Sequence, residues 1–358
     1  MPSLKEIKGR INSISSTLAI TSAMKMVAAA KLQKAQMAIQ NMLPYERRLY
    51  SMLVDLMGAM NISAAASEDG SVRGSGSAER GFDQSGDRLS LSNRHDLAGM
   101  DGAYSLMAQR EVRKVAIVAF ASNSSLCGAF NSNVIREATA VINEYRASGL
   151  GDADITVYSV GRKMAEAMKK LGFPSPADFT KMSDSPSYEA ASALAQELLD
   201  GFVSGRFDKV ELVYNHYKST SSQPTIRQTY LPLSLADATA DIQVGKITDS
   251  ASESDTNRGA EPVGAPVVRQ GSPTTEDLIV EPSKEALIAT LLPKVIRLRI
   301  FTTLLDSAAA EHAARTVAMQ LATDNGNDLL QELTLEYNKG RQQKITSEIL
   351  DLVGGSMQ

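Results

Sequence analysis

At 358 residues the chain is long enough for two domains, and its 43% hydrophobic and 22% charged residues are typical of a soluble protein. A net charge of −4 argues against a nucleic-acid partner, and a single cysteine, Cys127, excludes an internal disulfide. The sequence has no run of about 18 apolar residues and begins without the apolar segment of a secretory signal, so we expect membrane association only through partners.

Residues 1–60 predict one long helix with a single apolar seam. Apolar or small residues recur at alternating steps of four and three, the heptad spacing of a coiled coil. Ser3, followed by Glu6, predicts the N-cap, and Pro44 predicts a kink rather than an end. From Ala19 to Gln36 small or cationic residues replace large ones, so this part of the helix is thin. The seam positions are Ile7, Ile11, Ile14, Leu18, Thr21, Lys25, Ala28, Leu32, Ala35, Ile39, Met42, Leu49, Leu53, Leu56 and Met60.

Residues 109–235 predict a small Rossmann-like α/β domain. Strand-like and helical runs alternate, which is typical of a mostly parallel sheet covered by helices. The predicted strands are Val112–Phe120, Asp154–Val160, Lys209–Ser219 and, at an edge, Pro224–Leu233, and the predicted helices cover 131–147, 162–171 and 188–204. The segments 61–108 and 236–278 contain stretches rich in small polar residues, Ser63–Ala103 and Ala236–Thr275, which we interpret as inserted flexible loops.

Residues 279–358 predict a second long helix of the same kind. Ser283 predicts its cap and Pro293 a bend in its first turns. Two helices that each carry one apolar stripe bury those stripes most simply against each other, so we expect an antiparallel coiled coil between the two ends of the chain. The seam positions here are Val295, Leu298, Thr302, Leu305, Ala309, His312, Thr316, Met319, Thr323, Gly326, Leu330, Leu333, Tyr337 and Gly340.

Signals for catalysis, cofactors or metals are weak. The sequence has neither a Gly-x-x-x-x-Gly-Lys phosphate loop nor the glycines of a dinucleotide fingerprint after the first strand, and its three histidines, His95, His216 and His312, lack paired-ligand spacing. We therefore expect no catalytic residue, no cofactor and no metal site.

Three residues nevertheless belong to classes that can do chemistry. Cys127 follows a strand, where α/β enzymes often place a nucleophile, but no basic activator is adjacent in sequence. A small half-buried thiol is therefore the simpler interpretation. Asp306 and Glu311 on the last helix are interpreted as carboxylates of a solvated face.

Four stretches resemble the gamma subunit of the F-type ATP synthase. They are AMKMVAAAKLQKAQ, SSLCGAFN, LVYNHYKS with QPTIRQTYLPL, and EHAARTVAMQLATDNGNDLLQELTLEYNKGRQQKITSEILDLVGG, and together they cover nearly all of the chain outside the two insertions. The resemblance implies a non-catalytic rotor stalk, one copy per complex, that couples proton-driven rotation to ATP synthesis and regulates ATPase activity and proton flow.

The resemblance also implies partners and a location. The coiled coil would enter a hexamer of alpha and beta subunits, with catalysis on beta, and the α/β domain would lie near epsilon and the membrane c-ring. The chain begins without a transit peptide, which favours a bacterial protein, peripheral on the cytoplasmic side of the inner (plasma) membrane.

Site residues on the rod carry over by motif from the same resemblance. Met24 matches the region where the shaft faces beta, and Arg315 lies on the opposing helix in the region coupled to it. Lys25 and Lys31 suit an acidic partner through charge-assisted contacts, although an ordinary solvated helix face accounts for them equally well.

Further contacts are implied at a loop and at the C-terminal tip. Cys127 matches a position near the acidic beta loop that receives torque, while Arg341, Gln342 and Thr346 match the upper contact with beta. Just before Cys127, the stretch SNSS (Ser122–Ser125) stands where the family commonly has Ser-Asp-Arg-Gly, so an acid and a base are lost from this loop.

Two other functional classes remain open at this point. A coiled-coil adaptor or scaffold predicts the same rod without a fixed hexameric partner. A nucleotide-binding α/β enzyme centred on Cys127 predicts turnover by the isolated chain.

Overall fold

The computed structural model describes residues 3–68, 106, 110–233, 281 and 283–355. The predicted insertions Ser63–Ala103 and Ala236–Thr275 lie outside these residues, except for 63–68. Those six residues continue the first helix instead of beginning a loop, as the alanine-rich stretch Ala64–Ala66 favours.

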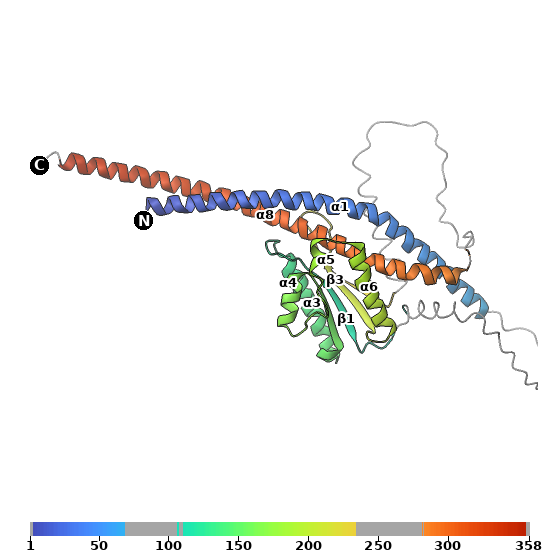
Figure 1. The fold of residues 1–358 in the computed structure, drawn as a ribbon. Helices are drawn as coiled ribbons and strands as arrows, with labels where there is room; N and C mark the ends of the chain where they lie inside the picture. The colour runs from blue at the N-terminus through green and yellow to red at the C-terminus, as the bar shows by residue number, and fades with distance from the viewer. Residues whose placement is uncertain (1–2, 69–105, 107–109, 234–280, 282, 356–358) are drawn as a thin grey trace, which may run out of the picture.

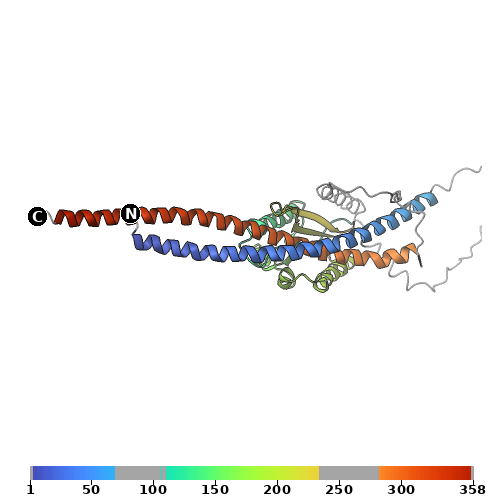
Figure 2. The ribbon, with the colours of Figure 1, turned by 90° about the horizontal axis from the view of Figure 1, so that it is seen from above.

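The two ends of the chain form a long antiparallel coiled coil, as predicted. Helix α1 (Leu4–Glu68) lies along helix α8 (Lys284–Gly355), and α8 extends past the N-terminus of α1 (Figures 1 and 2). Pro44 and Pro293 both lie inside their helices, so neither ends its helix. The cap hydroxyls accept bonds as predicted, Ser3 from the Glu6 amide and Ser283 from the Ala286 amide.

The predicted heptad seam is the buried face of both helices. In α1 the positions Ile7, Ala28, Leu32, Leu49, Leu53 and Leu56 are buried, and in α8 the positions Val295, Leu298, Leu305, Ala309, Met319 and Leu333 are buried. Pairing across the seam is antiparallel, because the Thr323 hydroxyl donates to Thr21 while the Thr302 hydroxyl donates to Glu46.

Close approach of the helices depends on small residues in α8. A Cβ placed on Gly326 would lie 2.7 Å from a terminal methyl of Leu18, and one on Gly340 would lie 3.1 Å from Leu4. Where α8 reaches the α/β domain, Ala309 and Ala313 are fully buried against Leu32 of α1. The thin middle of the sequence thus corresponds to a narrow rod.

The α/β domain contains a four-stranded sheet with the order β2-β1-β3-β4. Its strands are β1 (Val115–Phe120), β2 (Ile155–Val160), β3 (Lys209–Asn215) and β4 (Thr225–Leu231). β1 pairs in parallel with β2 and β3, whereas β4 is an antiparallel edge strand, so the prediction of a mostly parallel sheet is confirmed.

Helices cover both faces of this sheet. α3 (Phe130–Ala147) and α4 (Arg162–Lys170) pack on one face through residues such as Val134, Val141 and Met164. The other face packs on α6 (Tyr188–Val203), on Leu49–Leu56 of α1 and on Ile288–Leu304 of α8, so the domain and the rod share one core (Figure 1). Two short helices were not predicted, the 3-10 turn η2 (Asp152–Asp154) and α5 (Thr180–Asp184).

A buried carboxylate ties the sheet to α3. Glu211 on β3, 1% exposed, accepts hydrogen bonds from the Tyr145 hydroxyl at 2.7 Å and from Arg227 at 2.7 and 3.1 Å, and it pairs with Lys209 at 2.6 Å. Burial alone would raise the pKa of Glu211, but these partners outweigh it and hold the pKa below its usual value. This network lies on the face of the sheet away from the rod.

Candidate functional site

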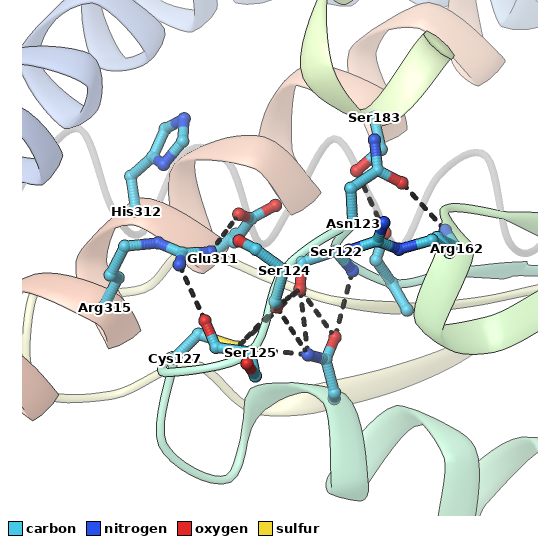
Figure 3. A network of polar contacts seen from close by, with 12 residues as sticks. Ser122, Asn123, Ser124, Ser125, Cys127, Arg162, Ser183, Glu311, His312 and Arg315 are labelled. Carbon is cyan, nitrogen blue, oxygen red and sulfur yellow. Dashed lines mark hydrogen bonds and ion pairs between the residues drawn. The ribbon is translucent and has the colours of Figure 1, made fainter. Parts of the chain in front are cut away.

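The loop after β1 lies at the carboxyl edge of the parallel strands, against α8 (Figure 3). Two asparagine side chains hold it. Asn131 accepts from the Ser122 amide at 3.0 Å and donates to the Ser124 carbonyl at 3.2 Å. Asn123 accepts from the Arg162 amide at 2.8 Å and donates to the Thr180 carbonyl at 2.8 Å. Because these bonds use backbone groups, the serine-rich loop is fixed without the charged pair it lacks.

Cys127 is fully buried beneath α8 rather than half-buried. Its side chain packs with Phe130 and Ala310, and its sulfur lies 3.2 Å from Asn131 Nδ2 and 3.8 Å from the Ser124 carbonyl oxygen. These described contacts include no base that would activate a thiol, so the geometry gives the enzyme hypothesis no support.

Exposed residues of this loop directly precede the buried Cys127. Ser124 and Ser125 are exposed, and Leu126 is 58% exposed with a φ of 66°, a left-handed conformation that is uncommon for leucine. A partner that approaches the loop from outside therefore meets Leu126 before Cys127.

Arg315 and Glu311 join α8 to the same loop. The Arg315 guanidinium donates to the Ser125 carbonyl at 2.9 Å and to Glu311 at 2.5 Å, and both residues are less than a tenth exposed (Figure 3). Burial raises the pKa of Glu311 despite the opposing effect of Arg315. The interpretation of Glu311 as a solvated carboxylate was wrong, because the domain covers this face of the helix.

His312 on α8 and Lys31 on α1 lie near the pair of Glu311 and Arg315. Burial, together with the positive charges of Lys31 and Arg315, lowers the pKa of His312 to about 4. His312 Nδ1 is buried and has no hydrogen-bond partner in the described structure. Lys31 itself is exposed, on α1 across from His312 and Glu311.

Asp306 was also wrongly interpreted as a solvated residue. Its carboxylate receives His216 Nδ1 at 2.6 Å and the Tyr217 amide at 2.9 Å, so it holds the segment after β3 against α8. This contact also explains why β3 ends at Asn215 and not at Ser219 as predicted. The side chain of Asp306 raises the pKa of His216 by accepting its hydrogen bond.

Of the other rod residues, Met24 and Lys25 are half-buried along the seam. No described contact joins Met24 to Arg315, because Arg315 points toward the domain and not across the seam.

Arg341, Gln342 and Thr346 lie on the part of α8 that extends past α1, and all three are exposed. The same tip exposes apolar side chains that were not predicted as contact residues, including Ile345, Ile349 and Leu352. Their i, i+4 and i+7 spacing places them on one face of the helix, so the sequence alone could have indicated this apolar stripe.

Two small pockets lie among the described residues. A cavity of about 10 Å³ between Phe120, Ser183, Ser307 and Glu311 has room for about one water molecule. A shallow hollow of about 230 Å³ lies at the amino end of the sheet near Lys114 and Arg206. The described residues contain no cluster of three or more metal-ligand side chains, and none of their helices has the length and apolarity to span a bilayer.

Comparison with known proteins places the whole chain in one family. The family described as ATP synthase (ATP-synt) matches residues 3–357. The chain is 47% identical over 357 residues to the ATP synthase gamma chain of Phocaeicola vulgatus and 45% identical over 358 residues to that of Bacteroides thetaiotaomicron, covering 100% of both sequences in each case. Its identity to the gamma chain of Flavobacterium johnsoniae is 36%, over 99% of this chain and 98% of the relative.

Solved structures agree in fold. A chain of the Euglena gracilis mitochondrial ATP synthase (OSCP/F1/c-ring, rotational state 3) superposes with a TM-score of 0.54 at 19% identity, over 99% of this chain and 93% of that one. A chain of the rotor of the same enzyme gives 0.51 at 18% identity, over 96% and 98%. With full-length relatives well above 30% identity and the coiled-coil architecture, the chain belongs to the ATP synthase gamma-chain family.

Proposed function

We propose that this chain is the rotating central shaft of a bacterial F-type ATP synthase and carries no catalytic site itself. Its upper coiled coil enters a hexamer of alpha and beta subunits, and its α/β domain lies below the hexamer, near epsilon and the c-ring. The observation that carries the proposal is the narrow antiparallel rod with a bare tip, in a chain whose full-length relatives are gamma chains.

The mechanism follows from asymmetry of the rod. One helix is longer than the other and the domain lies on one side, so each orientation presents different contacts to the three beta subunits. A contact that favours one state of a beta subunit over another shifts its equilibrium, and about 5.5 kcal/mol of difference moves it from 1:99 to 99:1. Proton flow turns the c-ring and the shaft, and beta makes ATP.

The implied contacts divide between the rod and its tip. Met24 and Lys25 lie on the part of α1 that faces the hexamer, Lys31 lies across from Glu311 at the level of the loop after β1, and Arg341, Gln342 and Thr346 lie on the protruding end of α8. At the loop after β1 we assign the direct contact to Leu126, since Cys127 is buried beneath it.

Partners also determine the location. One copy of the chain joins each complex, on the cytoplasmic side of the plasma membrane, and it is held there through the c-ring and epsilon. In this arrangement the chain regulates ATP hydrolysis and proton flow by linking the two.

Reconstitution with alpha and beta subunits tests the proposal. The substitution Met24→Lys places a cation in a close-fitting contact, where an added ion pair with beta resists rotation, so proton pumping per ATP should fall more than ATP hydrolysis. Met37→Lys is the matched control, because it adds the same charge to α1 beside Gln36, at the level of the α/β domain.

Two results would contradict the proposal. Equal loss of pumping and hydrolysis in Met24→Lys would remove the coupling role from this position. A complex that lacks alpha and beta subunits after mild purification would favour the adaptor hypothesis.

A further inference from the structure

The segment that follows β3 reaches both helices of the rod through one residue. The Tyr217 amide donates to Asp306 on α8 at 2.9 Å, and its hydroxyl accepts from Gln36 Nε2 on α1 at 2.6 Å. His216, next to it, pairs with the same Asp306. Tyr217 therefore connects the sheet, α8 and α1 by directional bonds at one level.

The tyrosine ring adds packing to these bonds. It contacts the cluster of Leu32, Ala309 and Ala313 between the helices and also the cluster of Cys127, Phe130 and Ala310 at the edge of the sheet. The half-buried ring thus fills the space where the two helices and the domain meet.

This level of the rod needs such a connection because its own seam is weak. The buried α8 residues that face α1 here, Ala309 and Ala313, are too short to interlock with α1 as leucines would. Helices whose side chains interdigitate little resist sliding or rotation past each other less than helices packed knobs into holes. A bulky side chain supplied by the domain compensates for this.

We propose that Tyr217 is a positioning residue that ties α1 and α8 to the α/β domain, so that torque on the domain enters both helices together. This inference rests on the proposed rotor function. If the tie is broken, the domain still drives α8 at this level through Asp306 and Arg315, whereas the direct packing of α1 on the domain lies further along the rod, in the shared core of Leu49, Leu53 and Leu56.

Two substitutions isolate the bond to α1. Tyr217→Phe removes the hydroxyl and keeps the ring, and Gln36→Leu removes the donor from the other side. Tyr145→Phe is the matched control, because the Tyr145 hydroxyl is also bonded at 2.7 Å, but to Glu211 on the face of the sheet away from the rod.

The test is single-molecule rotation of the assembled complex, with the hexamer fixed and a bead on the α/β domain. We expect a wider angular distribution during each pause for Tyr217→Phe and Gln36→Leu, no further widening in the double variant, and no widening for Tyr145→Phe. In the same complexes the exchange rate of backbone amides in residues 216–223 should rise about fivefold, which corresponds to a net hydrogen bond of about 1 kcal/mol.

Unchanged angular width in Tyr217→Phe, or equal widening in Tyr145→Phe, would overturn the inference, because the first removes the mechanical role and the second makes it a general loss of stability. Failure of the proposed function looks different. In that case the wild-type chain itself would not assemble into a rotating complex.

Discussion

Replacement of Arg315 by alanine tests whether the domain is held to the rod by a buried ion pair. Arg315 is 9% exposed and Glu311 8%, and the arginine also holds the Ser125 carbonyl. Removing one partner of a buried pair costs about 3–5 kcal/mol, since the other charge remains in a poorly solvated place. We expect a loss of about 3 kcal/mol for Arg315→Ala, because the charge of Lys31 still favours ionised Glu311.

The pH dependence gives the prediction its sign. Burial already raises the pKa of Glu311, and loss of Arg315 raises it further. A carboxyl with a raised folded-state pKa is most favourable below its unfolded pKa, about 4.3, and loses that contribution as pH rises through the folded value. The penalty of Arg315→Ala should therefore be larger at pH 7 than at pH 5.

Urea unfolding of the purified variants, followed by circular dichroism, measures these differences. The double variant Glu311→Gln with Arg315→Gln has no buried charge, so it should be more stable than Arg315→Ala at pH 7 by about 1–3 kcal/mol. A loss below about 1 kcal/mol, or a penalty that does not vary with pH, would refute the picture of a buried, ionised Glu311.

Two further predictions concern the seam and the clamp at Asp306. Gly326→Leu should cost about 1–3 kcal/mol by pushing against Leu18, whereas Gly9→Leu, with no atom within 4 Å of the added Cβ, should gain up to about 1 kcal/mol from helix propensity; equal effects in urea unfolding would contradict the close approach. His216 has a raised pKa from Asp306, so the stability that Asp306→Asn removes should be largest below about pH 6.5 and shrink as pH rises through the raised pKa. Wild type and Asp306→Asn both retain His312, whose lowered pKa makes stability rise with pH, so the difference in unfolding free energy between the two proteins isolates His216. A difference in unfolding free energy that grows with pH would exclude the ion pair.

The rod could be predicted from the sequence because its spacing is local and repetitive. Each seam residue from Ile7 to Leu56 marks the same helix face as the residue three or four places away, and α8 repeats the pattern. The strands were predicted for a similar reason, since β1 and β3 are short apolar runs flanked by breaks in the pattern.

The contacts between rod and domain could not be predicted in this way. Asp306 and Glu311 lie outside the apolar stripe, where the periodicity of a single helix assigns residues to solvent. Their partners, His216 and Ser125, are distant in sequence. The local sequence of α8 gives no pattern that predicts a contact between its other face and the α/β domain. The same limit applies to Tyr217, whose role depends on Gln36, far away in the chain.

The altered loop after β1 shows how a contact can persist when its side chains change. The sequence of Ser122–Ser125 predicts a loop that lacks a charge pair. In the structure Arg315 binds the backbone carbonyl of Ser125, a group that every residue offers, and Asn131 and Asn123 bind backbone groups as well. The position of the loop on α8 therefore does not depend on its side-chain charges. What the serines change is the surface offered outward, which is neutral around the exposed Leu126.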